Sequence, residues 1–103
     1  MRGFLLSPDA DEDVFQIWSY LFQRAGIETA NRIESELYDA FEALTATPGQ
    51  GHRRSDLTNQ PVLFFALYQY MIVYRVKTSL EIVRVLHGKR DLGRILQTEA
   101  TLS

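Results

Sequence analysis

The last part of this chain contains three runs of β-forming residues with very short breaks between them, and this spacing constrains the fold more than any other feature. The runs are Val62–Leu67, Tyr70–Val76 and Leu80–His87. Because the breaks are so short, each strand must turn back beside the previous one, which predicts an antiparallel three-strand meander. Both sides of these strands are largely apolar, so we expect both faces of the sheet to be covered, or one to be left for a partner.

The first half of the chain predicts a short strand followed by two helices. Ser7-Pro8 is typical of a helix start, because serine caps free backbone amides and proline suits the first helical position. Apolar residues then recur at spacings of three and four as far as Ala25, and Gly26 ends the helix. A second amphipathic helix is predicted from about Glu28 to Ala46. Two such helices with a short connection form an antiparallel hairpin.

These elements predict an α+β domain in which the helix hairpin packs on an antiparallel sheet. The chain of 103 residues fits one domain, residues 1–103, with its core at about 4–92. A short helix from Asp91 to about Gln97 and a polar tail are expected at the end. Between Thr47 and Gln60, proline, glycine, asparagine, serine and arginine predict a loop.

Composition excludes several classes of protein. The chain has no cysteine and only two histidines, and no spacing of ligand residues suggests a metal or another cofactor. The longest apolar run, Val62–Tyr68, is far shorter than the roughly 20 residues that span a membrane. The first apolar run is too short for a signal peptide, so we expect a cytoplasmic protein. The net charge of −2 argues against nucleic acid as the direct partner.

Basic residues in the second half are the strongest candidates for a binding site. Arg75 and Arg84 fall inside strands, and a turn centred on Thr78-Ser79 places them close together on one face. Like charges in such positions repel unless acids or a partner neutralise them. The same alternation predicts one face with Met71, Val73, Ile82 and Leu86, and an opposite face with Tyr70, Ile72, Tyr74, Val76, Val83, Val85 and His87. The acids early in the first helix are expected to face solvent.

Several motifs together resemble the ParE/RelE superfamily of toxins. Residues 13–20, Asp-Val-Phe-Gln-Ile-Trp-Ser-Tyr, are similar to the first-helix signature of ParE proteins. Ala30 and Ile33 match the second helix of that family. The loop residues that match are Pro48, Gly51, Arg54, Asp56 and Leu57. The last two strands and the closing residues 87–91, His-Gly-Lys-Arg-Asp, match as well, so the resemblance covers about residues 4–92.

The resemblance implies the toxin of a type II toxin–antitoxin pair, which a small cognate antitoxin neutralises. ParE members with a known target poison DNA gyrase, whereas RelE members cut messenger RNA on the ribosome. Three departures favour the ParE type. Met71 stands where RelE ribonucleases have an arginine, the strand Val62–Leu67 has no lysine, and no tyrosine follows Tyr74. A RelE-type ribonuclease and a family member without toxicity remain the alternatives.

We therefore expect a protein that binds other proteins and has no catalytic residues. The residues expected to bind the target are Arg53, Arg54, Arg84, His87 and Arg90. The residues expected to bind the antitoxin are Met71, Val73, Arg75, Ile82, Arg84 and Leu86. In the alternative ribonuclease, His87 would have to serve as the general base.

Overall fold

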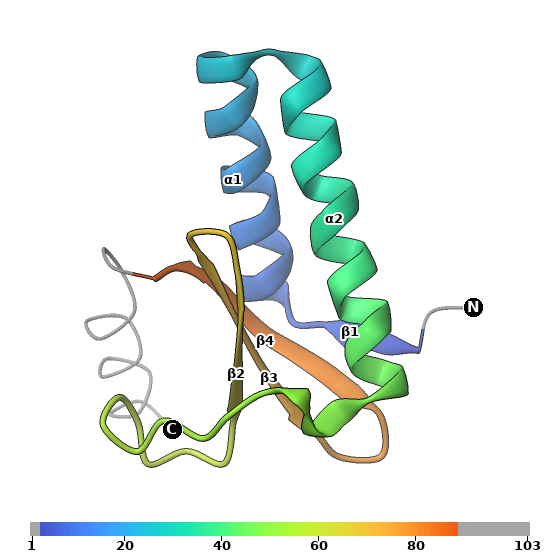
Figure 1. Ribbon diagram of the computed structural model, residues 1–103, viewed down its shortest axis with the longest axis vertical. Helices are drawn as coiled ribbons and strands as arrows, with labels where there is room; N and C mark the ends of the chain where they lie inside the picture. Colours follow the sequence, from blue (N-terminus) through green and yellow to red (C-terminus); the bar gives the residue numbers. More distant parts are fainter. Residues whose placement is uncertain (1–2, 89–103) are drawn as a thin grey trace.

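A computed structural model describes residues 3–88, and its elements follow the predicted order (Figure 1). The elements are β1 (Phe4–Leu6), α1 (Pro8–Ala25), α2 (Ile27–Ala46), the 3₁₀ turn η1 (Pro48–Gln50), β2 (Leu63–Leu67), β3 (Tyr70–Val76) and β4 (Leu80–His87). The predicted bounds of the two helices and of the three meander strands agree with these to within one residue. The helix expected from Asp91 lies outside the described residues.

The ends of α1 form as the sequence predicts. The Ser7 hydroxyl accepts a hydrogen bond from the Ala10 N–H at 3.0 Å, and Pro8 is the first helical residue. At the other end, Gly26 has a φ of 92°, a conformation that glycine adopts without steric cost, and its N–H donates to the Phe22 carbonyl at 3.1 Å. This single residue turns the chain into α2, so the two helices lie side by side as a hairpin.

The four strands form one sheet in the order β1-β4-β3-β2. The meander of β2, β3 and β4 is antiparallel, as predicted. β1 pairs with β4 in the parallel direction, so the sheet is mixed and not wholly antiparallel. This pairing reaches only from Phe4↔Leu80 to Leu6↔Ile82. The remaining outer edge of β4 therefore has a different neighbour, the first turns of α1.

A β-bulge in β4 changes which residues share a face. Val73 pairs with Arg84, but Tyr74 pairs with Ile82, so Val83 is an extra residue in β4. The strict alternation assumed from the sequence was wrong at this point. Ile82 packs on the helix side of the sheet, and Val83 packs on the other side, the reverse of the prediction.

The main core lies between the helix hairpin and the sheet. Its largest fully buried members are Leu37, Phe41 and Leu44 from α2 with Ile72, Tyr74 and Ile82 from the strands. A second, smaller cluster covers the opposite face of the sheet, where Val62, Phe64, Val73 and Leu86 are buried and Leu57 packs against them. The open apolar face that the sequence suggested is therefore filled in part by the segment between η1 and β2.

Tyr74 fixes the start of that segment. Its hydroxyl donates to the Pro48 carbonyl at 2.6 Å and accepts from the Gly51 N–H at 2.8 Å. Gly51 has no room for a side chain, because a Cβ there would overlap the Tyr74 hydroxyl oxygen. Burial raises the pKa of the Tyr74 phenol, so it stays protonated, as its bond to the Pro48 carbonyl requires.

Candidate functional site

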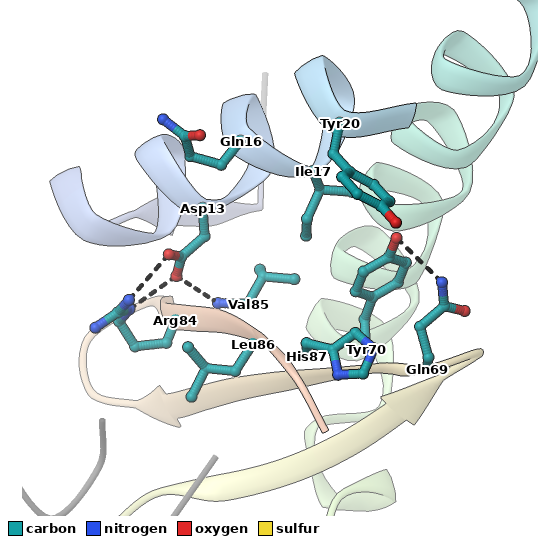
Figure 2. Close-up of a pocket in the computed structure, with 10 residues that line it drawn as sticks. All are labelled: Asp13, Gln16, Ile17, Tyr20, Gln69, Tyr70, Arg84, Val85, Leu86 and His87. Atoms are coloured by element: carbon teal, nitrogen blue, oxygen red, sulfur yellow. Dashed lines mark hydrogen bonds and ion pairs between the residues drawn. The ribbon is translucent and has the colours of Figure 1, made fainter. Parts of the chain in front are cut away.

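A cavity of about 330 Å³ lies between α1 and the C-terminal end of β4 (Figure 2). α1 supplies one wall, β4 supplies the other, and the turn between β2 and β3 closes one end. The lining residues are Asp13, Gln16, Ile17, Tyr20, Gln69, Tyr70, Arg84, Val85, Leu86 and His87. The α1 residues follow a spacing of three and four, which places them on one side of the helix.

The cavity combines apolar walls with polar groups. Ile17 and Leu86 contribute apolar surface, and Gln69 donates a side-chain hydrogen bond to the Tyr70 hydroxyl at 3.3 Å. The His87 ring meets the Tyr70 ring edge-on, with centroids 6.4 Å apart. Tyr20 is 52% exposed at the rim, whereas Tyr70 is buried. Such a mixture suits a ligand with an uncharged side chain and hydrogen-bonding groups.

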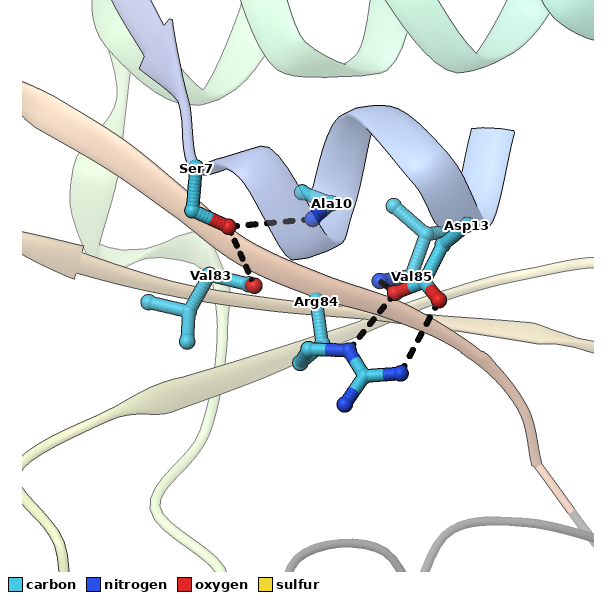
Figure 3. A network of polar contacts seen from close by, with 6 residues as sticks. All are labelled: Ser7, Ala10, Asp13, Val83, Arg84 and Val85. Carbon is cyan, nitrogen blue, oxygen red and sulfur yellow. Dashed lines mark hydrogen bonds and ion pairs between the residues drawn. The ribbon is translucent and has the colours of Figure 1, made fainter. Parts of the chain in front are cut away.

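An ion pair between Asp13 and Arg84 forms the other end of the cavity (Figure 3). The Arg84 guanidinium donates to both carboxylate oxygens of Asp13, at 2.8 and 2.9 Å. The same carboxylate also accepts the Val85 N–H at 2.9 Å. Both side chains are only 15% exposed. The expectation that the acids of the first helix face solvent is thus wrong for Asp13, which joins α1 to β4.

Ser7 makes a second connection between the start of α1 and β4. Its hydroxyl donates to the Val83 carbonyl at 2.7 Å while accepting from Ala10, and its N–H donates to the Ile82 carbonyl at 2.9 Å. Figure 3 shows both connections along the same strand edge. Val83 is the extra residue of the bulge, and this explains why the successive carbonyls of Ile82 and Val83 both bind Ser7.

The two arginines of the sheet, which were expected to repel each other, are each paired with a carboxylate of the chain itself. Arg84 binds Asp13, and Arg75 donates to Glu81 at 2.6 Å on the neighbouring strand. Glu81 lies directly opposite Arg75 in the register of β3 and β4. Arg84 was expected in an exposed set of target-binding residues, but it is mostly buried because the carboxylate of Asp13 holds it against α1.

The other residues expected to bind the target lie in different places. His87 lines the cavity with Arg84, whereas Arg53 and Arg54 lie in the segment before β2 and do not line it. Arg54 makes two hydrogen bonds to Asp56, at 2.9 and 2.8 Å, and these lower the pKa of the Asp56 carboxyl. Arg90 is outside the described residues. The contribution of these residues to target binding stays a prediction.

The residues expected to bind the antitoxin do not form an open groove. Val73 and Leu86 are buried in the smaller cluster, and Ile82 is buried on the helix side because of the bulge. Met71, Arg75 and Arg84 are partly exposed, so they are the members of this set that a partner can reach. Antitoxin binding by these residues also stays a prediction.

Neither a metal site nor a membrane span is seen in residues 3–88. No group of three or more His, Asp or Glu side chains in this range could hold a metal ion. Neither α1 nor α2 is long and apolar enough to cross a membrane.

The arrangement of helices and strands is that of a known fold. A chain from the solved structure of a chromosomal ParDE TA system from P. aeruginosa superimposes with a TM-score of 0.71. The match covers 84% of this chain and 96% of that chain, at 20% sequence identity. The fold class is therefore the ParE/RelE-like α+β fold predicted from the sequence.

Sequence comparison then identifies the family. The family model described as ParE toxin of type II toxin-antitoxin system, parDE, matches residues 4–92. Toxin ParE1 of Caulobacter vibrioides is 34% identical over 87 residues, which is 84% of this chain and 90% of that protein. Toxin ParE1 of Mycobacterium tuberculosis is 30% identical over 95 residues, covering 90% and 96%. This chain belongs to the ParE toxin family of type II toxin–antitoxin systems.

Proposed function

We propose that this protein binds and poisons DNA gyrase in the cytoplasm and that a cognate antitoxin neutralises it. One observation carries the proposal of a binding mechanism. Both arginines of the sheet, Arg75 and Arg84, are held by carboxylates of the chain itself. A guanidinium already bound to a carboxylate is poorly placed to neutralise a phosphate.

The groups around the cavity support the same proposal. Cleavage of RNA without a metal needs a base, an acid and cations around the phosphate. His87 is the imidazole at this cavity, and its neighbours include the amides of Gln16 and Gln69, which do not titrate. A site of this composition is better suited to binding a protein segment than to moving protons.

His87 and Tyr70 provide the specific observation for the alternative, a ribosome-dependent ribonuclease of RelE type. Their rings touch edge-on, and both line the cavity. In that mechanism His87 would take a proton from the RNA hydroxyl, so His87→Gln would abolish activity even though binding remained. In the gyrase mechanism, His87→Gln should retain most of its activity.

One expression experiment distinguishes the mechanisms. The wild-type protein and the His87→Gln variant are induced in a bacterial host, and purified protein is added to a gyrase supercoiling and DNA-cleavage assay. We expect growth arrest, accumulation of double-strand breaks and intact messenger RNA with both proteins. Messages cut within ribosome-bound codons by wild type alone would establish the ribonuclease. A host that grows normally, with neither effect, would identify a family member without toxicity.

A further inference from the structure

The side of α1 that points away from the cavity carries exposed aromatic rings. Phe15 and Phe22 are 57% and 45% exposed, and they lie two helical turns apart on the same side. Trp18 lies between them and stacks on Phe22, with ring centroids 5.1 Å apart. Since each residue turns the helix by about 100°, this side is opposite to the one that lines the cavity with Ile17 and Tyr20. Exposed apolar rings grouped in this way indicate a surface that binds another molecule.

Trp18 also connects this surface to α2. Its indole N–H donates to the Asn31 side-chain oxygen at 2.9 Å. Figure 1 shows the two helices extending together beyond the sheet, so no strand of the described range covers their far ends. The rings are therefore held on a pre-formed surface that spans both helices.

A groove of about 330 Å³ lies between the two helices beside Phe15. Phe15 and Val14 supply apolar surface, and Asp11, Glu12 and Glu34 supply carboxylates. Neither lysine nor arginine lines the groove. Within residues 3–88, none of these three carboxylates forms an ion pair. The groove therefore combines an exposed ring with negative charge that the described part of the chain does not neutralise.

The charge of the hairpin decides which partners fit this surface. Residues 8–46 contain nine acidic residues and only two arginines. Arg32 pairs with Glu36, and Arg24 lies over the Tyr20 ring, so neither arginine neutralises the groove. Nucleic acid, an anionic membrane and the same face of a second copy are all negatively charged and would be repelled. A protein segment with lysine or arginine side chains is attracted.

We infer that the outer face of the hairpin, made of Phe15, Trp18 and Phe22 with the acidic groove beside them, docks a positively charged segment of the target protein. This inference rests on the proposed function, which identifies the target as gyrase. An enzyme that acts on DNA needs basic surfaces to contact the phosphates, so such a target has the required charge. The alkyl part of a lysine or arginine side chain lies against Phe15, and its charged group pairs with Asp11 and Glu34.

The test measures the affinity of purified gyrase for variants of the toxin. Asp11→Asn/Glu34→Gln removes two charges from the groove and leaves the side-chain shapes nearly unchanged. Glu28→Gln/Asp39→Asn is the matched control, because it removes the same charge from exposed positions of α2 that do not line the groove. We expect the groove variant to weaken the Kd about tenfold and the control to change it less than about twofold.

The aromatic part of the surface has its own pair of variants. Phe15→Ala should weaken the same Kd about tenfold, whereas Tyr20→Ala, which removes a 52% exposed ring from the opposite side of α1, should change it less than about twofold. Equal losses in the groove variant and its charge control would show a general effect of net charge and would overturn the inference. Normal binding by the groove variants with loss of binding by Arg53→Ala/Arg54→Ala would place the target on the segment before β2, and would also overturn it.

A second measurement does not depend on gyrase. Trp18 is the single tryptophan of the chain, so its fluorescence reports on this face without a label. The probe is a synthetic amphipathic helical peptide with arginines on its polar side, compared with the same peptide carrying glutamates. We expect a saturable change in fluorescence with the arginine peptide alone, which weakens as salt is added and is lost in Asp11→Asn/Glu34→Gln. No change, or an equal change with the glutamate peptide, would overturn the inference.

The outcomes separate this inference from the function on which it rests. If the wild-type toxin bound the arginine peptide as expected but did not bind gyrase, the docking surface would be supported and the proposed target refuted. If gyrase bound the wild type and all groove variants equally, the proposed target would stand and the inference would be wrong. If the groove variants lost the cognate antitoxin and kept gyrase, the antitoxin would occupy this face, and the inference would again be wrong.

Discussion

Removal of the Asp13 carboxylate should destabilise the protein more than loss of any surface charge. The carboxylate accepts three hydrogen bonds, two from Arg84 and one from the Val85 N–H, and is 15% exposed. In Asp13→Ala a mostly buried guanidinium loses its counter-charge, and a buried N–H loses its acceptor. Breaking a buried pair costs about 3–5 kcal/mol. Since some water reaches the pair, we expect Asp13→Ala to lower the free energy of unfolding by about 3 kcal/mol.

A double-mutant cycle tests whether this cost comes from the pair. Arg84→Met should cost about 2 kcal/mol alone, because Asp13 keeps its bond to Val85. The double variant should cost about 3 kcal/mol and not the sum of the two, since the unpaired charge is gone. Urea unfolding with an unchanged m-value measures these differences. Asp56→Ala is the control, because its pair with Arg54 is exposed and should contribute nothing measurable. Additive effects, or a loss below about 1 kcal/mol in Asp13→Ala, would refute the reasoning.

Three further changes follow from the structure. Gly51→Ala should cost about 1–3 kcal/mol, because the new methyl would meet the Tyr74 hydroxyl, and Tyr74→Phe in the same chain should recover part of that loss in urea unfolding. Since burial raises the pKa of Tyr74 above its usual 10.0, the unfolded chain ionises first, so stability should fall as pH rises through that value. Tyr74→Phe should lack this component of the alkaline loss, which pH-dependent denaturation can detect. Tyr68 has a φ of 57°, so Tyr68→Gly should change the free energy of unfolding by less than about 1 kcal/mol. Tyr68→Val should lower the stability more in thermal unfolding, because a branched side chain suits this conformation poorly. A Tyr68→Val protein as stable as Tyr68→Gly would contradict this account.

Local signals in the sequence were enough to predict most of the fold. Ser7-Pro8 and Gly26 set the ends of α1, because capping and positive φ depend on a few adjacent residues. The meander followed from short breaks between β-forming runs. These features depend on adjacent residues, so they can be predicted without knowing how the rest of the chain is arranged.

The bulge in β4 could not be predicted in the same way. Ile82 and Val83 are both apolar, and both faces of the sheet are covered, so neither position revealed to which side it belonged. If polar and apolar residues had alternated along β4, the sequence would have shown the residue at which the side chains change from one face of the sheet to the other. The prediction that Ile82 shares a face with Met71, Val73 and Leu86 failed for this reason.

The candidate site was predicted only in part. Arg84 and His87 were singled out as site residues, but Asp13, Gln16 and Tyr20 were not, because their neighbours in the cavity lie roughly 50 to 70 residues further along the chain. One signal was present in the sequence. Asp13, Ile17 and Tyr20 repeat at intervals of four and three, so a polar, an apolar and an aromatic side chain share one side of α1 next to the buried face.

The pairing of β1 with β4 decides when a newly made chain can fold. Ser7 and Val83 are 76 residues apart, and Asp13 and Arg84 are 71 apart. Contacts of such long sequence separation form late, because a long loop must close before they are made. A chain that has been synthesised only as far as Ser79 has neither the partner strand for β1 nor the arginine for Asp13. During translation, the wall of the cavity that β4 provides is therefore missing until nearly the whole described part of the chain exists.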